Sequence, residues 1–197
     1  MTPSPWREIN TMTVSFGHGV AVSPVQLASA VSTVVNGGLA VPATILKRAP
    51  TDPIPARRAV SAETSENMRR LLRLVVTEGT GKNADAPGYL VGGKTGTAEK
   101  LGSGGDYQRR ALLSSFVGAF PMDNPRYVVL AVLDEPKGTK RTHGYATGGW
   151  VAAPVVGKVI TRMASFIGIT PVDENAPEIR EAFAVELNPR GTTLASY

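Results

Sequence analysis

The chain contains no cysteine among its 197 residues and only two histidines. It can therefore form no disulfide and offers no thiolate for catalysis or metal binding. No uninterrupted apolar run is long enough to span a bilayer. Aromatic residues make up only 6% of the chain and are not interleaved with the scattered basic residues. Although the net charge is +5, this composition disfavours nucleic-acid binding, and we expect neither a metal nor a cofactor.

One segment, from Gly92 to Thr97, concentrates residue types that suggest chemistry. In an extended strand Lys94 and Gly96 share one face, and Thr95 and Thr97 share the other. The glycines allow another backbone to come close. Such a strand offers an ammonium group, two hydroxyls and an unobstructed row of backbone N–H groups. These are the groups that bind a substrate carboxylate and an oxyanion in acyl transfer.

The same segment also matches a phosphate-binding loop. Residues Gly88 to Thr95 fit the pattern G-x-x-x-x-G-K-[ST] without a mismatch, and the apolar run 128–133 ends in acidic residues, as a magnesium-binding strand does. The loop needs a helix after it, because the helix N-terminus binds the phosphates. Residues 96–105 contain four glycines and no helical period. A helix beginning at Lys94 would support a P-loop nucleotide-binding protein, whereas a strand through Thr97 would exclude it.

The hydrophobic pattern predicts three helices. The first begins at the capping box Ser23-Pro24-Val25-Gln26 and ends at Asn36-Gly37-Gly38. It is apolar most of the way round, which predicts deep burial. The second covers residues 62–77, with Ser61 as its cap and an apolar stripe at helical spacing. Its polar face carries three arginines that we expect in solvent, Arg69, Arg70 and Arg73.

The third predicted helix covers residues 151–167 and ends at Gly168. We expect its apolar residues to point inward: Val151, Val155, Val156, Val159, Ile160, Met163 and Ile167. Before the first helix, Trp6 and Phe16 are expected to be buried and so to anchor the N-terminal segment. His18, between two glycines and without an acidic neighbour in sequence, is interpreted as structural or exposed in preference to catalytic.

Residues 41–46 are predicted as a short extended piece, and residues 112–120 and 127–133 as strands of an antiparallel hairpin. The second of these is β-branched and continuous, which predicts a central place in its sheet. From residue 170 the composition becomes acidic. We therefore divide the chain into a body, residues 1–169, and a flexible or loosely docked acidic tail, residues 170–197.

Three segments, residues 91–100, 115–121 and 127–136, resemble the penicillin-binding proteins. More narrowly, they are similar to the class B peptidoglycan D,D-transpeptidases of the division (septal) type. Residues 15–38 and 147–154 are similar to the same family, so that the resemblance runs from about Phe16 to Ile167. Lys94-Thr95-Gly96 is the third member of the motif set S-x-x-K, S-x-N and K-T-G. The resemblance implies an α+β fold carrying the last three strands of a five-stranded antiparallel sheet.

The resemblance also implies roles for single residues. Lys94 would tune the proton network around the nucleophile. Thr95 and Thr97 would hold the carboxylate of a D-Ala-D-Ala stem peptide or of a β-lactam, and Gly96 would keep the strand bare so that substrate backbone can pair with it. The backbone N–H of Thr97 would supply half of the oxyanion hole.

The chain departs from the family in one respect, because it contains no S-x-x-K. The nucleophilic serine and its activating lysine are thus absent. Ser65-Glu66-Asn67 matches S-x-N, but it lies on a predicted helix and is interpreted as chance. In the family both motifs come earlier. We therefore expect this chain to be the C-terminal part of a transpeptidase domain that cannot be acylated alone.

The resemblance further implies a whole protein at the periplasmic face of the bacterial inner membrane, working with other cell-division proteins. An incomplete sheet is expected to expose apolar faces, and a dimer through an edge strand is one possible consequence. A third alternative is a non-catalytic interaction module with the same fold. It would be favoured if the complete gene product also lacked the serine and the lysine.

Overall fold

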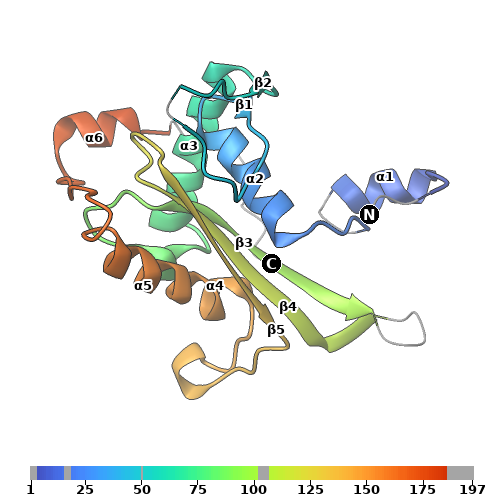
Figure 1. Ribbon diagram of the computed structural model, residues 1–197. Helices are drawn as coiled ribbons and strands as arrows, with labels where there is room; N and C mark the ends of the chain where they lie inside the picture. Colours follow the sequence, from blue (N-terminus) through green and yellow to red (C-terminus); the bar gives the residue numbers. More distant parts are fainter. Residues whose placement is uncertain (1–3, 16–18, 50, 102–106, 186–197) are drawn as a thin grey trace.

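The computed structural model describes residues 4–15, 19–49, 51–101 and 107–185. Its centre is a three-stranded antiparallel sheet with the strand order β3-β4-β5. The strands are β3 (Gly92–Leu101), β4 (Tyr107–Phe120) and β5 (Tyr127–Asp134). The main helices are α2 (Pro24–Val35), α3 (Ala62–Thr77), α4 (Gly148–Val151) and α5 (Ala153–Met163). The predicted α+β class with an antiparallel sheet is confirmed (Figure 1).

The two faces of the sheet are covered by different helices, and α2 and α5 lie on opposite sides of it (Figure 1). Alternation along β4 explains the arrangement, because successive side chains of a strand point to opposite faces. Phe116 and Phe120 are fully buried in a cluster with Val156 of α5. Ala119 is buried in a second cluster with Val35 of α2. The core therefore has two layers, one on each side of β4.

The double glycine that opens β3 is required by close packing. A Cβ atom on Gly92 would overlap the side chain of Met122, and one on Gly93 would overlap the carbonyl of Val117 and the ring of Phe116. Both glycines are buried. Any larger residue would push β3 away from β4 and from the segment after it.

Helix α2 begins where the capping box predicts. The Ser23 Oγ accepts a hydrogen bond from the Gln26 N–H at 3.2 Å, and the Gln26 Oε1 accepts one from the Ser23 N–H at 2.9 Å. The prediction of deep burial is wrong. Val35 is the buried residue of this helix, whereas the side chain of Val25 is 63% exposed. One side of α2 packs on α3 and the sheet, and the described residues leave its outer apolar side uncovered.

Helix α3 has the predicted bounds and the predicted cap, since the Ser61 Oγ accepts from the Thr64 N–H at 3.0 Å. The expectation of a solvated arginine face is wrong for Arg73, which is buried. Its guanidinium donates to Asp85 and to the carbonyl of Val91, each at 2.8 Å, and to Glu174 at 2.7 Å. Charged and carbonyl acceptors satisfy the planar guanidinium, so that it tolerates burial.

The C-terminal segment docks on the body as far as the structure describes it. Helix α6 (Pro177–Ala182) follows Glu174, whose carboxylate accepts from both Arg73 and the Gly88 N–H. Ile179 and Phe183 pack against the cluster that contains Val35. The flexibility of the acidic tail and its boundary at residue 170 stay predictions.

Several short elements differ from those expected. The predicted extended piece at residues 41–46 contains no strand; instead β1 (Leu39–Ala40), just before it, pairs with β2 (Arg57–Arg58). Within the described residues β5 is an outer strand and β4 is central, so the predicted central place of β5 is wrong. A continuous apolar run predicts a strand that is buried on both faces, which is typical of a central strand. In this part of the chain, however, the outer edge of β5 has no strand partner.

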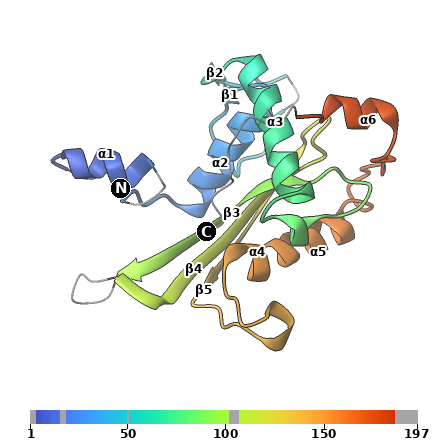
Figure 2. The ribbon, with the colours of Figure 1, turned by 180° about the vertical axis from the view of Figure 1, so that it is seen from behind.

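The N-terminal residues also differ from expectation. Helix α1 (Glu8–Ser15) forms without any buried residue and stands away from the sheet in both views (Figures 1 and 2). Trp6 is 53% exposed, so its predicted burial is wrong. Phe16 and His18 lie outside the described residues. No helix in the described ranges combines the length and the apolarity that a membrane span requires.

The predicted third helix is divided at Ala152 into α4 and α5. Val156 and Ile160 point inward as expected, but Val155 and Val159 are 42% and 40% exposed. Small residues share the buried face of this segment with Val156 and Ile160: Ala153 and Gly157 in α5, and Ala164 just after it. A Cβ atom on Gly157 would lie 3.0 Å from the carbonyl oxygen of Ala84, so this glycine allows α5 to pack closely against the 3₁₀-helix η1 (Lys82–Ala84).

We predict that Arg73→Met destabilises the chain by about 2–4 kcal/mol, because it leaves Asp85 and Glu174 without their shared cation. Arg70→Met is the matched control, since Arg70 pairs on the helix surface with Glu66, and we expect a loss below about 1 kcal/mol. Urea unfolding monitored by circular dichroism measures both. Equal losses in the two variants would contradict a structural role for the buried arginine.

Candidate functional site

The segment from Lys94 to Thr97 lies in the middle of β3, on the outer strand of the sheet. Its register sets Thr95 opposite Phe116, and Thr97 opposite Ser114. Because the chain continues as a strand through Thr97, no helix N-terminus follows Lys94. The phosphate-loop alternative for Gly88 to Thr95 is therefore wrong.

The ammonium group of Lys94 folds back over its own strand. Its Nζ donates to the Thr95 carbonyl at 3.0 Å and lies 3.4 Å from the Thr95 Oγ1. That hydroxyl is also 3.0 Å from the Thr80 Oγ1, in the loop after α3. Lys94 is exposed, and within the described ranges no carboxylate pairs with it. A cation next to two hydroxyls, without a resident anion, is a suitable arrangement for binding a carboxylate.

Thr97 holds the start of helix α4 against the strand. Its Oγ1 accepts a hydrogen bond from the Gly148 N–H at 3.0 Å. Gly148 is buried, and a Cβ atom there would overlap the Ser115 carbonyl and lie 2.5 Å from the Gly96 carbonyl. Only glycine permits this approach. Since the hydrogen bond from Gly148 uses an acceptor lone pair, the Thr97 hydroxyl keeps its own proton to donate.

Gly96 leaves the strand bare between the two threonines. A Cβ atom at this position would lie 2.5 Å from the Ser115 Oγ of the neighbouring strand. One position earlier on β4, the fully buried Ser114 donates to the Ala146 carbonyl at 2.6 Å and fixes the segment before α4. The segment that leads into α4 is thus bonded to both strands, to β4 through Ser114 and to β3 through Thr97.

The loop between β5 and α4 is held by aromatic contacts. The ring of Trp150 stacks on Tyr145, with centroids 5.6 Å apart, and meets the edge of His143 at 5.4 Å. A short 3₁₀-helix, η2 (Lys140–Thr142), precedes His143 in this loop. On the other side of α4, the Asn83 side chain, in the 3₁₀-helix η1 (Lys82–Ala84), donates to the Gly149 carbonyl at 2.9 Å. These contacts hold α4 in place beside Thr97.

A second charged group lies farther along β3. Lys100 pairs with Glu135 at 2.8 Å and with Asp134 at 2.9 Å. These hydrogen bonds, that of Glu135 first, raise the pKa of Lys100 above its ordinary value. Because the pKa of Lys100 is higher in the folded than in the unfolded state, protonated Lys100 stabilises the fold. This stabilisation is present at neutral pH and is lost only as the pH rises through the folded-state pKa. The cluster lies at the surface with its charges paired, so Lys94 is the unpaired cation of this strand among the described residues.

The structure brings together all four predicted site residues and adds three that the sequence did not single out for chemistry: Thr80, Asn83 and Gly148. Only Gly148 had a sequence signal, since it lies in the segment 147–154 that resembles the family. Ser65, in the S-x-N match, is buried and accepts from the Gly37 N–H at 3.0 Å. Its hydroxyl therefore serves the junction of α2 and α3. His18 lies outside the described residues.

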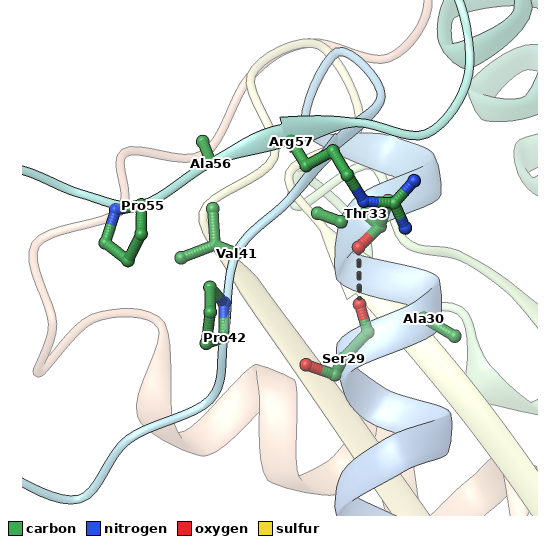
Figure 3. Close-up of a pocket in the computed structure, with 9 residues that line it drawn as sticks. Ser29, Ala30, Thr33, Val41, Pro42, Pro55, Ala56 and Arg57 are labelled. Atoms are coloured by element: carbon green, nitrogen blue, oxygen red, sulfur yellow. Dashed lines mark hydrogen bonds between the residues drawn. The ribbon is translucent and has the colours of Figure 1, made fainter.

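The described residues contain no cluster of three or more potential His, Cys, Asp or Glu metal ligands. A cavity of about 490 Å³ lies between α2 and the β1–β2 pair, away from Lys94 (Figure 3). Small and apolar side chains line most of it, and its one charged residue is Arg57. The lining of this cavity contains no nucleophile beside a base, whereas β3 presents a cation next to hydroxyl groups. We therefore place the candidate functional site on β3.

We predict that Thr97→Val is less stable than Thr97→Ser by about 1 kcal/mol, because valine leaves the N–H of the buried Gly148 without its acceptor. Strand preference alone favours valine over serine, so the sign of the difference identifies the hydrogen bond. Urea unfolding of both variants is the measurement. A valine variant at least as stable as the serine variant would show that the bond is dispensable.

The comparisons with known proteins agree with this geometry. Residues 1–161 match the family model described as penicillin binding protein transpeptidase domain. The probable peptidoglycan D,D-transpeptidase FtsI of Caulobacter vibrioides is 44% identical over 177 residues, which cover 86% of this chain and 30% of that protein. Stage V sporulation protein D of Bacillus subtilis is 40% identical over 173 residues, covering 83% of this chain and 26% of that protein. The chain thus spans less than a third of the length of these curated relatives.

Solved structures give the same result. The apo transpeptidase domain of Burkholderia pseudomallei penicillin-binding protein 3 matches with a TM-score of 0.75 and 39% identity, covering 85% of this chain and 49% of that chain. Penicillin-binding protein 3 from Mycobacterium tuberculosis, complexed with ampicillin, matches with a TM-score of 0.75 and 28% identity, covering 91% of this chain and 42% of that one. The chain therefore belongs to the penicillin-binding protein transpeptidase family.

Proposed function

We propose that this chain is the part of a serine D,D-transpeptidase that carries the K-T-G strand. The whole protein would cross-link peptidoglycan stem peptides and bind β-lactams covalently. One observation supports this proposal above the others. On an outer strand, the Lys94 ammonium lies beside the Thr95 hydroxyl at 3.4 Å, with no carboxylate paired to it in the described residues. A stem peptide and a penicillin each supply the carboxylate that such a pair attracts.

Each residue of the strand has a distinct role in this proposal. Lys94 attracts the carboxylate and tunes the proton network of the nucleophile. The hydroxyls of Thr95 and Thr97 hydrogen-bond the carboxylate, and Thr80 orients Thr95 through the 3.0 Å contact. Gly96 keeps the strand accessible to substrate backbone. The Thr97 N–H stabilises the oxyanion of the tetrahedral intermediate, a contribution for which one donor is typically worth about 10²–10³ in rate.

The nucleophile of the reaction is proposed to lie outside these 197 residues, because no serine in the chain is followed by a lysine three positions later. Within the described residues, the outer edges of β3 and β5 have no strand partner. Leu113 and Val132 are 40% and 43% exposed on this sheet. These features support a sheet that is completed by further strands, either from the rest of a longer protein or from a second copy of the chain. We further propose that the whole protein acts at the periplasmic face of the inner membrane with other cell-division proteins.

We predict that the 197-residue chain forms no covalent adduct with fluorescent penicillin, whereas the product of the complete gene does. Intact mass and peptide mapping measure both. The adduct is expected on a serine of an S-x-x-K motif outside the chain. A stoichiometric adduct on a serine within the chain would disprove the proposed division of the site. A complete product without the motif and without an adduct would favour the non-catalytic module.

We also predict that Thr95→Val in the complete product slows acylation by a carboxylate-bearing penicillin about 10- to 100-fold, because a charge-assisted hydrogen bond is lost. Thr95→Ser is the control and retains most of the rate. Stopped-time labelling with fluorescent penicillin gives both rate constants. Equal rates in the two variants would remove Thr95 from the carboxylate site.

A further inference from the structure

A cationic groove lies between the η2 loop and helix α5, outside the K-T-G site. It has a volume of about 560 Å³. Four of its lining side chains are basic, Lys137, Lys140, Arg141 and Lys158, and Trp150 and Asn83 complete its polar and aromatic lining. All four basic residues are exposed. The groove is thus a positively charged channel beside one aromatic ring.

No acidic side chain neutralises this groove. The lining contains no aspartate or glutamate, and none of the four basic side chains forms an ion pair within the described ranges. Asp85, which lines an adjoining hollow together with Lys158, forms an ion pair with Arg73, and Arg73 also pairs with Glu174. Uncompensated cations of this density raise the local concentration of anions.

Helix α4 contributes to both the groove and the candidate site. Trp150 lines the groove, and two residues earlier Gly148 donates to the Thr97 hydroxyl. Asn83 lines the groove as well and donates to the Gly149 carbonyl. The groove and the candidate site therefore lie next to the same short helix.

The composition of the groove distinguishes between classes of anion. Three of its four cations are lysines, which act as point charges toward carboxylates and phosphates alike. It has a single aromatic side chain, Trp150, and so lacks the row of rings on which successive nucleic-acid bases stack. Separate anionic groups therefore suit this lining better than a strand of stacked bases, and the substrate of the proposed function carries such groups as carboxylates.

We propose that this groove binds a second stretch of carboxylate-bearing glycan-peptide polymer, of the same chemical class as the substrate of the K-T-G site. The proposal rests on the proposed function and extends it. The groove holds the polymer by its charge, so that one of its peptides remains near β3. The cross-linking reaction joins two strands, and a separate anchoring site for polymer would keep them together between reactions.

The test uses the 197-residue chain and soluble, uncross-linked peptidoglycan strands that carry a fluorophore. Fluorescence anisotropy gives the affinity for native strands and for strands whose carboxylates are amidated. The groove variant combines Lys140→Gln, Arg141→Gln and Lys158→Gln. The control variant combines Arg7→Gln, Lys47→Gln and Arg48→Gln, and removes three positive charges outside the groove. We expect the groove variant to bind native strands about tenfold more weakly and the control to bind nearly as the parent does.

Two further results are expected. Amidation should weaken binding to the parent chain to the level of the groove variant, and added salt should weaken it by screening. Equal binding of native and amidated strands, or equal losses in the groove and control variants, would overturn the proposal. Tighter groove-dependent binding of duplex DNA or of phosphatidylglycerol vesicles would overturn it in favour of that other polyanion.

Penicillin labelling of the complete product distinguishes this proposal from the proposed function. The groove variant is expected to be acylated at the parent rate, because its substitutions lie off the β3 strand. Acylation without groove-dependent strand binding would refute the groove alone. Groove-dependent binding without any adduct would remove the transpeptidase function and leave a carboxylate-polymer site on a non-catalytic module.

Discussion

The hydrogen bond from the Gly148 N–H to the Thr97 hydroxyl requires the backbone of α4 to lie directly against two strands. A Cβ atom on Gly148 would meet the carbonyls of Ser115 and Gly96. That contact fixes the beginning of α4, and with it the position of α5 on the sheet. It also orients Thr97 beside Lys94 and Thr95. The geometry of the candidate site therefore depends on how closely the backbone of α4 can approach β3 and β4. Glycine at position 148 permits this approach, because it has no Cβ atom.

The buried guanidinium of Arg73 performs a similar task at the other end of β3. It joins α3, the carbonyl just before β3, the segment after η1 and the C-terminal segment through three short hydrogen bonds. Burial strengthens these interactions electrostatically, but it also makes them interdependent, because one unpaired charge is costly in that environment. β3 is thus constrained at its entry by Arg73 and along its length by α4.

The errors of the sequence analysis have a common physical origin. Arg73 on a polar helix face, Val155 and Val159 on an apolar one, and the apolar circumference of α2 were all assigned from periodicity. Periodicity gives the direction in which a side chain points, but not what lies there. Arg73 meets two carboxylates, and Val155 and Val159 remain exposed beside the buried face of α5. The outer side of α2 faces no described residue.

Local chemistry was predictable where the interactions are local. The capping box at Ser23, the cap at Ser61 and the end of α2 before Gly37-Gly38 involve residues within a few positions of one another, and they lie where the sequence predicted. The predicted helix end at Gly168 is wrong, because α5 ends at Met163. The antiparallel pairing of β4 with β5 followed from two strand-like segments joined by a short turn, and the resemblance implied the third strand. The four residues from Lys94 to Thr97 were identified as a strand that binds carboxylates, in competition with a phosphate loop that fits the same letters.

Tertiary structure decided the rest. Because β3 continues after Lys94 and no helix begins there, the phosphate-loop interpretation of that segment is excluded and the strand interpretation is kept. The hydrogen bonds of Thr80 and Gly148 with the strand, and of Asn83 with α4, join residues up to 66 positions apart. The sequence by itself determined which groups β3 could offer, because alternation and capping act over a few residues. Only the folded chain determined which of those groups meet, because hydrogen bonds between distant segments depend on how closely their backbones can pack.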